Sequence, residues 1–220
     1  MEDASRADID FLCRVAEEAQ RVIDRLGAQF SATDLVMTEE QKERSASALV
    51  DICAALEMFH AAALVHDDLL DNSDTRRGSP AVHKKFESLH ENSNWAGSAS
   101  RFGQAGSVIA GDLMLGWSSE LFDSGVKRAP SGEIAWNCRD EFAKMRIEVM
   151  AGQYLDVYEQ SLGTQSVERS MKVARYKSGK YTIERPLHFG AALAQAPKDL
   201  ISTYSKYGIP LGEAFQLRDD

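Results

Sequence analysis

Three carboxylates stand close together where a long apolar stretch of the chain ends. In the segment HDDLLDNSDTRRG, which covers residues 66–78, Asp67, Asp68 and Asp71 occupy positions i, i+1 and i+4. If this segment is helical, Asp67 and Asp71 share one face of the helix and Asp68 borders that face. The carboxylates would also lie near the negative end of the helix dipole. Because these charges repel one another, the arrangement indicates that a cation binds among them.

Magnesium is the cation that suits these ligands. It prefers hard oxygen ligands, keeps several of its waters, and commonly bridges one or two carboxylates to substrate phosphates. Five residues after Asp71, Arg76 and Arg77 offer planar guanidinium groups that match phosphate oxygens. The segment therefore predicts a Mg²⁺-dependent diphosphate site. A solvated acidic helix end with a basic loop is the alternative, and it explains a lone DDxxD better than the complete string.

A second acidic pair ends the chain. Gln216 precedes Asp219 and Asp220 by three and four residues, so the three side chains can share a helix face. Alone, this pair is more often a solvated tail. Together with the first segment, it favours a cage of carboxylates that holds several Mg²⁺ ions around one diphosphate.

Two motifs between the acidic segments contain further candidates, GQYLD at residues 152–156 and YKSGKYT at residues 176–182. Lys177 could neutralise a diphosphate, although in isolation a surface lysine is the simpler interpretation. Gln153 could direct an amide dipole at developing positive charge or could simply pack between helices. Gly111 is interpreted as a close helix contact, and Asp112 as a residue that supports the ligands.

Composition narrows the function classes. The chain has 220 residues, a net charge of −9 and a pI near 5.1, which argues against a nucleic-acid-binding protein. Its cysteines, Cys13, Cys53 and Cys138, form neither a metal-binding spacing nor a disulfide framework. No leader and no apolar run of about 18 residues is present, so the sequence predicts a cytoplasmic protein without a transmembrane segment.

The periodicity of apolar residues predicts an all-α protein. Residues 31–48 lose the helical pattern and become polar, and residues 87–104 are rich in Ser, Asn and Gly and predict a long loop. No strand alternation of useful length occurs. We therefore expect a bundle of long antiparallel helices. The helical patterns cover residues 5–29, 48–70, 105–123, 132–162, 166–194 and 198–220.

Taken together, HDDLLDNSDTRRG, GQYLD, YKSGKYT and FQLRDD resemble the motifs of the trans-isoprenyl diphosphate synthases, or polyprenyl synthetases, over roughly residues 48–220. Details such as SDTRRG are closest to actinobacterial short-chain and geranylgeranyl diphosphate synthases. The resemblance implies one isoprenoid-synthase domain over residues 1–220, with its helices around a central cavity, and a homodimer. It also implies a prenyltransferase that condenses isopentenyl diphosphate head-to-tail with dimethylallyl, geranyl or farnesyl diphosphate.

The resemblance also implies roles for individual residues. Asp67, Asp68 and Asp71 would hold Mg²⁺ on the allylic diphosphate, and Asp219 and Asp220 would complete a set of three ions. Arg76 would contact the allylic diphosphate, whereas Arg77 and His60 would bind isopentenyl diphosphate; without the motif, His60 would be a core histidine. The residues implied to line the allylic site are Gln153, Lys177 and Ser178, with Gln216 helping to place Asp219.

Product length is argued from the helix that ends in the first acidic motif. A growing chain should run along this helix away from the aspartates, in a cavity dry enough to protect an allylic cation from water. Ala62 and Ala63 lie where an aromatic residue would block the tunnel in short-product enzymes of this kind. Met58 and Phe59, about one turn or 5.4 Å deeper, are candidates for its floor. This favours the C20 product, geranylgeranyl diphosphate, with farnesyl or longer products as alternatives, and Ala62→Phe should shorten the product.

Two departures from the family pattern leave other hypotheses open. The basic Gly-Gly-Lys-Arg-x-Arg-Pro motif is missing, and Lys42 and Arg44 do not replace it. The C-terminal helices that follow the second acidic motif are also missing. We expect these residues to be part of a longer chain, and the alternative is a truncated or accessory protein. The competing functions are a terpene cyclase, which has less use for Arg77, and a non-catalytic regulatory subunit that binds allylic diphosphate.

Overall fold

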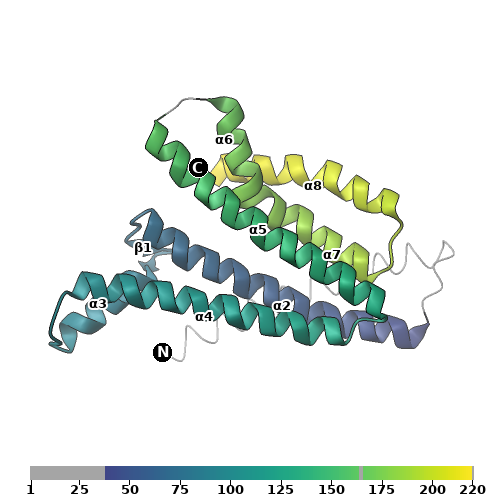
Figure 1. Cartoon of the computed structure of the whole chain (residues 1–220), viewed down its shortest axis with the longest axis horizontal. Helices are drawn as coiled ribbons and strands as arrows, with labels where there is room; N and C mark the ends of the chain where they lie inside the picture. Colours follow the sequence, from purple (N-terminus) through teal and green to yellow (C-terminus); the bar gives the residue numbers. More distant parts are fainter. Residues whose placement is uncertain (1–37, 164–165, 220) are drawn as a thin grey trace. The chain divides into compact units, whose positions relative to one another are not determined.

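The computed structural model describes residues 38–163 and 166–219 (Figure 1). Its contacts group the chain into two compact units. The α2–α4 unit comprises residues 51–124. The described part of the α5–α8 unit comprises residues 38–50, 125–163 and 166–219. The helical pattern expected at residues 5–29 lies outside the described residues.

Helix α2 (Glu39–Leu70) begins well before Ala48, where the sequence predicted its start. The backbone N–H of Gln41 donates to the Thr38 hydroxyl at 3.2 Å, and the Thr38 N–H donates to the Gln41 side-chain oxygen at 2.9 Å. This reciprocal pair is a capping box. Residues 39–48, which lie in the stretch where the apolar helical pattern is lost, are therefore helical. Their Glu, Gln, Lys and Arg side chains are good helix formers that need no apolar face.

The core of the α2–α4 unit lies along one face of α2. Ile52, Ala55, Phe59 and Ala62 recur at helical spacing, and each is no more than 2% exposed. Helix α4 (Ala99–Lys127) contacts this helix. Its buried Ser118 hydroxyl donates a hydrogen bond to the Ala55 carbonyl of α2 at 2.7 Å. The predicted buried helix over residues 48–70 is confirmed.

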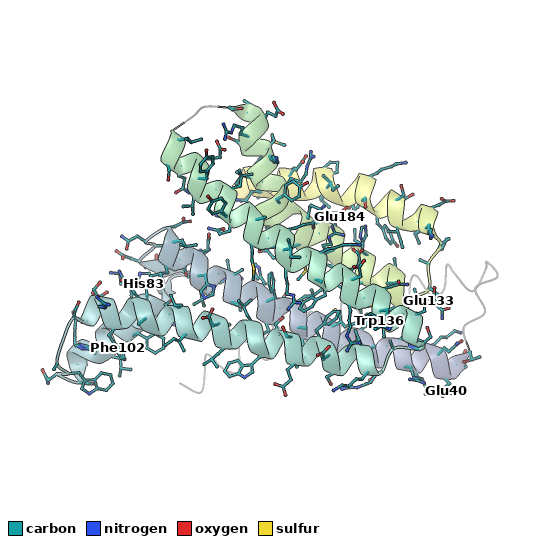
Figure 2. The ribbon with its side chains drawn as sticks, in the orientation of Figure 1. Glu40, His83, Phe102, Glu133, Trp136 and Glu184 are labelled. Atoms are coloured by element: carbon teal, nitrogen blue, oxygen red, sulfur yellow. The ribbon has the colours of Figure 1, made fainter. Side chains whose placement is uncertain are left out.

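The long loop predicted over residues 87–104 was wrong, because α3 (Val82–Asn92) and α4 leave only residues 93–98 between them. A Cβ atom on Gly103 would lie 2.4 Å from the His83 carbonyl oxygen, and one on Gly106 would lie 2.8 Å from the Phe86 ring. These glycines are therefore contact points between helices α3 and α4. His83 and Phe102, which mark the two helices, are labelled in Figure 2.

In the α5–α8 unit the predicted helix at residues 132–162 is confirmed as α5 (Gly132–Leu162). Ser131 caps its first turn, and Gly163, with φ +61°, ends it. Phe142 of α5 packs against Phe189 of α7, with ring centroids 6.5 Å apart. The pattern at residues 166–194 divides into α6 (Val167–Val173), the π-helix η1 (Ala174–Glu184) and α7 (Arg185–Leu193), followed by α8 (Lys198–Asp219).

The π-helix η1 contains the YKSGKYT motif and packs against both α5 and α8. Glycines permit both contacts. A Cβ atom on Gly152 of α5 would lie 2.3 Å from the backbone nitrogen of Lys177, and one on Gly212 of α8 would lie 2.4 Å from the Gly179 carbonyl oxygen. Long π-helices are rare and recur at functional sites. The motif is therefore held between two glycine contacts.

The all-α prediction is confirmed, since the strands in the described part of the chain are β1 (Thr75–Arg76) and β2 (Ser79–Pro80), two residues each. Cys53 and Cys138 are free thiols, and burial raises the pKa of Cys53 to about 11 and that of Cys138 to about 12. The expectation that no apolar run of about 18 residues occurs was wrong for α2, which among the described helices is long and apolar enough to cross a bilayer, a property that core helices of water-soluble proteins share.

Candidate active site

Helix α2 ends inside the first acidic motif. Its last residue is Leu70, and the N–H of Asn72 then donates to the Leu69 carbonyl at 3.3 Å, while the N–H of Ser73 donates to the Asp68 carbonyl at 2.8 Å. These two bonds form a Schellman motif. Asn72 takes the left-handed conformation that this motif requires, with φ +51°. Asp67 and Asp68 therefore lie in the last helical turn, and Asp71 lies just beyond it.

A tight hairpin follows and places the arginine pair. Strands β1 and β2 pair Arg76 with Ser79, so that Arg77 and Gly78 form the turn. Both turn residues have positive φ, +52° for Arg77 and +77° for Gly78, as in the two-residue turns that fit the twist of a hairpin. The glycine of RRG thus has a structural reason, because glycine adopts a positive φ without strain.

Arg76 folds back onto the end of α2. Its Nε and Nη2 atoms donate to the Asp68 Oδ1 atom at 2.9 and 2.5 Å, and its Nη2 atom lies 3.7 Å from the Asp67 Oδ2 atom. The Asp68 side chain is 3% exposed, the Asp67 side chain 19%, and the Arg76 side chain 39%. The structure therefore brings Arg76 together with the first two acidic residues, and it buries Asp68 beneath the guanidinium group.

His60 lies in the same unit, two turns before Asp67. Burial lowers its pKa below the ordinary value, with Arg77 and Arg76 lowering it further and Glu57 opposing them. Its imidazole is therefore largely neutral at pH 7 while it lies in the positive field of both arginines. A group of this kind can gain a proton when an anion binds nearby.

The carboxylates at the end of α2 fit Mg²⁺ only if water and a bound phosphate supply its remaining oxygen ligands. Within residues 38–163 and 166–219, no three His, Cys, Asp or Glu side chains are arranged to hold a metal ion by themselves. Asp67 is half-buried and Asp71 is exposed. Two such carboxylates suit an ion that takes its other ligands from water and phosphate.

The α5–α8 unit contains the second set of candidates. The Lys177 Nζ atom lies 2.6 Å from the Asp156 Oδ2 atom, and both side chains are about one-fifth exposed. Ser178 is buried and Gln153 is half-buried. Asp156 is thus a direct partner of Lys177. The sequence analysis assigned it no role, although it is the last residue of the GQYLD motif, and its place in that motif could have identified it.

The second acidic motif is described only in part. Gln216 is half-buried on α8, Asp219 is the last residue of that helix, and Asp220 lies outside the described residues. These residues belong to a different unit from Asp67, Asp68 and Asp71. Their convergence on one metal cluster stays a prediction.

The interpretation of Gly111 as a close helix contact agrees with the structure. A Cβ atom on Gly111 would lie 2.1 Å from the Nε2 atom of His66. That nitrogen lies 3.2 Å from the Val108 carbonyl oxygen and 3.6 Å from the Asp112 Oδ1 atom. Because a carbonyl oxygen only accepts, the Nε2 atom carries a proton. The Asp112 carboxylate thus lies near the histidine that precedes Asp67, but beyond hydrogen-bond distance of it.

The four chain-length candidates differ in burial. Ala62 and Phe59 lie on the buried face of α2, with exposed fractions of 0% and 2%, whereas Met58 and Ala63 are half-buried. An aromatic side chain at position 62 would therefore enter a filled core. Position 63 has more room for a larger side chain.

Comparisons with known proteins agree on the family. The model of the polyprenyl synthetase family matches residues 20–220. The chain belongs to the polyprenyl synthetase family. A geranylgeranyl diphosphate synthase of Methanosarcina mazei is 28% identical over 90% of this chain and 55% of its own length. A farnesyl diphosphate synthase of Bacillus subtilis is 30% identical over 78% of this chain and 53% of its own length.

Solved structures of the same family show the same fold. A geranylgeranyl pyrophosphate synthase of Corynebacterium glutamicum, complexed with isoprenyl diphosphate and magnesium, is 44% identical with a TM-score of 0.75, over 79% of this chain and 48% of that chain. The chain therefore spans about half the length of the relatives that it matches. Polyprenyl synthetases similar to it carry names with different products, from farnesyl to geranylfarnesyl diphosphate.

Proposed function

We propose that this polyprenyl synthetase is a Mg²⁺-dependent prenyltransferase that condenses isopentenyl diphosphate head-to-tail with an allylic diphosphate. The observation that carries the proposal is the pairing of Arg76 with the acidic end of α2. Arg77 also lies close enough to His60 to lower the pKa of its imidazole. Carboxylates for a divalent ion and cations for phosphate oxygens then occupy one small unit. The magnesium and isoprenyl diphosphate bound to the Corynebacterium glutamicum relative support this assignment.

Each candidate residue has a task in the proposed reaction. Asp67, Asp68 and Asp71, with Asp219 and Asp220 from the second motif, would hold Mg²⁺, which when bound would supply positive charge where the departing diphosphate becomes more negative. Arg76 and Lys177 would bind the oxygens of the same diphosphate. His60 and Arg77 would orient isopentenyl diphosphate so that its double bond attacks the allylic carbon. The residues that would complete the allylic site are Gln153, Ser178 and Gln216.

The product proposed is the C20 compound, geranylgeranyl diphosphate. The argument is the small size of Ala62 and Ala63 beside Asp67, with Met58 and Phe59 about one helical turn further away. Because Ala62 is fully buried, Ala63→Phe is a better test of length control than Ala62→Phe. We expect Ala63→Phe to shift the main product from C20 toward C15, with Ala63→Val as a milder control.

One assay tests the reaction and the product together. The protein is incubated with Mg²⁺, isopentenyl diphosphate and farnesyl diphosphate, and the products are sized by chromatography. A linear C20 diphosphate supports the proposal. A cyclic hydrocarbon formed without isopentenyl diphosphate would instead identify a terpene cyclase.

A non-catalytic subunit is the second candidate, and a specific observation favours it. Lys42 and Arg44 are the basic residues nearest the place of the missing basic motif. The Lys42 Nζ atom pairs with Glu39 at 2.7 Å, and the Arg44 Nη2 atom donates to the Ala129 carbonyl at 3.2 Å. Both basic groups therefore have structural partners. Tight binding of farnesyl diphosphate without turnover, in the same assay, would support this candidate.

We also propose that residues 1–220 belong to one isoprenoid-synthase domain and that the protein works as a cytoplasmic homodimer. The family membership supports these assignments. Sedimentation of the purified protein tests the dimer, and fractionation of the cells that produce it tests the location.

A further inference from the structure

The π-helix η1 presents two rows of contacts, one to α5 and one to α8. The residues that meet α5 are Tyr176, Lys180 and Arg185, the last of which begins α7. The residues that meet α8 are Arg175, Gly179 and Glu184. Each row advances by four and then by five residues. Nine residues make about 2.5 turns of an α-helix, which would place the first and last members of a row on opposite faces. The wider winding of η1 therefore keeps both rows in contact.

Glu148 of α5 binds two side chains that are five residues apart. The Lys180 Nζ atom lies 2.5 Å from the Glu148 Oε1 atom, and the Arg185 Nη2 atom donates to both oxygens of the same carboxylate, at 2.8 and 2.7 Å. In an α-helix, side chains five residues apart diverge by about 140° around the axis. Here the backbone N–H of Arg185 donates to the Lys180 carbonyl, which is the hydrogen bond of a π-helix. Glu148 thus joins the side chains of two residues whose backbones that bond also joins.

The three charged groups of this bridge are largely removed from water. The exposed fraction of the side chain is 20% for Glu148, 14% for Lys180 and 8% for Arg185. Removal of one partner from such a pair leaves an uncompensated charge in a poorly solvated place, which is strongly destabilising. If the Glu148 charge were lost, the two cations would therefore be driven to separate, and the π-helical turn between them would lose its side-chain support.

Glu141 provides a contrast on the same helix. Its Oε2 atom lies 2.5 Å from the Arg185 Nη1 atom and 3.3 Å from the His188 Nδ1 atom. Both of these partners belong to α7. Glu141 therefore ties α5 to α7, whereas Glu148 ties α5 to both ends of a π-helical turn.

The winding of this turn affects Lys177, which lies three residues before Lys180. The Lys177 backbone meets Gly152 of α5, and its Nζ atom lies 2.6 Å from the Asp156 Oδ2 atom. A change from π-helical to α-helical winding after Lys177 would rotate this part of η1 relative to α7. The direction of the Lys177 side chain therefore depends on the turn that Glu148 bridges.

We propose that Glu148 is a positioning residue that bridges Lys180 and Arg185, holds η1 in its π-helical winding and so directs Lys177 toward the allylic diphosphate. This inference rests on the proposed function, which assigns that ligand to Lys177. Neither Glu148 nor Lys180 would touch the substrate, and both would act through the placement of η1.

The test compares Glu148→Gln with Glu141→Gln, because each variant removes one carboxylate charge that binds Arg185 from α5. The KM values for farnesyl and isopentenyl diphosphate are measured separately. Glu148→Gln should raise the KM for farnesyl diphosphate about tenfold. It should leave the KM for isopentenyl diphosphate within about twofold of the parent, since the proposed ligands His60 and Arg77 belong to the other unit. Glu141→Gln should leave both KM values within about twofold of the parent, although it lowers stability.

Hydrogen exchange provides a readout that does not depend on turnover. The amides of residues 174–184 should exchange faster in Glu148→Gln than in Glu141→Gln, because the π-helical hydrogen bonds open more often. Lys180→Gln keeps the pair between Glu148 and Arg185 and replaces Glu148→Gln if that variant does not fold. It should raise the KM for farnesyl diphosphate in the same way, and the double variant Glu148→Gln/Lys180→Gln should show less than the sum of the two effects.

Two kinetic results would overturn the inference. One is a KM for farnesyl diphosphate that is unchanged in both Glu148→Gln and Lys180→Gln, and the other is a rise equally large in Glu141→Gln. A parent protein that forms no longer prenyl diphosphate would overturn the proposed function instead. The exchange comparison would then still decide whether Glu148 holds the π-helical winding.

Discussion

Gly152 lies directly against the backbone of Lys177. A Cβ atom on the glycine would lie 2.3 Å from the backbone nitrogen of Lys177 and 2.4 Å from the carbonyl carbon of Tyr176. The obstacle is backbone, which cannot rotate aside as the end of a flexible side chain can. The close approach of α5 and η1 is therefore possible only because Gly152 has no side chain. The proposed diphosphate ligand Lys177 is placed by this contact and by its ion pair with Asp156.

Gly152→Ala should accordingly displace η1 and the lysine together. We expect a loss of about 1–3 kcal/mol in the free energy of unfolding, as in other overpacked interiors, and a KM for farnesyl diphosphate raised about tenfold. Urea denaturation and steady-state kinetics measure the two effects. Gly190→Ala is the matched control, because its Cβ atom would meet nothing within 4 Å in helix α7 of the same unit. If Gly152→Ala lost stability but kept an unchanged KM, the contact with Gly152 would not position Lys177 for substrate binding.

Two other glycine contacts should differ in cost because their neighbours differ in freedom. A Cβ atom on Gly212 would meet the Gly179 backbone at 2.4 Å, whereas one on Gly111 would meet the His66 ring at 2.1 Å. The ring can rotate at the loss of its hydrogen bond to Val108, but the backbone cannot.

Gly212→Ala should therefore lower the free energy of unfolding by about 2–3 kcal/mol, and Gly111→Ala by about 1 kcal/mol. Chemical denaturation of both variants measures the order. A larger loss for Gly111→Ala would show that the His66 ring is fixed as firmly as a backbone.

The residues at element boundaries explain how much of the fold the sequence could predict. The predicted bounds of helix α5, residues 132–162, match the observed ones, and Ser131 and Gly163 cap its two ends. The start of helix α2 was predicted too late, although Thr38 and Gln41 form a capping box whose residue types are recognisable in the sequence. The loop predicted at residues 87–104 was wrong because Gly103, a residue type common in loops, lies inside α4, where it permits close packing against α3.

The candidate site was predictable in residue types but not in pairings. The spacing of HDDLLDNSDTRRG indicated acids and phosphate-binding bases, and the structure brings Arg76 to Asp68 and Asp67. Asp68 continues the buried face of α2 that includes Ala62 and Val65, but the spacing could not show that Arg76 returns to pair with it. The contacts of η1 with Gly152 and Gly212 join residues that lie far apart in sequence, and periodicity did not show its π-helical winding.

His60 should make substrate binding depend on pH. Its pKa lies below the ordinary value of 6.5, chiefly because of burial, so the imidazole is largely neutral at pH 7. A diphosphate bound beside it favours the charged form, and binding must then take up a proton. The affinity for isopentenyl diphosphate should therefore rise as the pH falls from 8 toward 6.

The measurement is the KM for isopentenyl diphosphate at several pH values in the parent and in His60→Gln. Because the ligand itself titrates in this range, the ratio of the two KM values is the useful quantity. It should move in favour of the parent as the pH falls. A ratio that is constant across the range would remove His60 from the binding site.

Glu141 should make the stability of the α5–α8 unit depend on pH in the acid range. Its carboxylate lies 3.3 Å from the Nδ1 atom of His188 and 2.5 Å from the Nη1 atom of Arg185, which Glu148 binds from the other side. The hydrogen bond from His188, with the charge of Arg185, lowers the pKa of Glu141 from 4.5 to about 2. Glu184 of the same region is labelled in Figure 2.

The sign follows from the depressed pKa. A carboxylate with a lower pKa in the folded state stabilises the fold above its unfolded pKa, and this contribution is lost as the pH falls from about 4.5 to about 2. Glu141→Gln should therefore be less stable than the parent by on the order of 2 kcal/mol at pH 6. The difference should shrink steadily below pH 4.5. Glu120→Gln, at an exposed position in α4, is the control and should track the parent; a gap for Glu141→Gln that stayed constant from pH 6 to pH 2.5 would contradict the assignment.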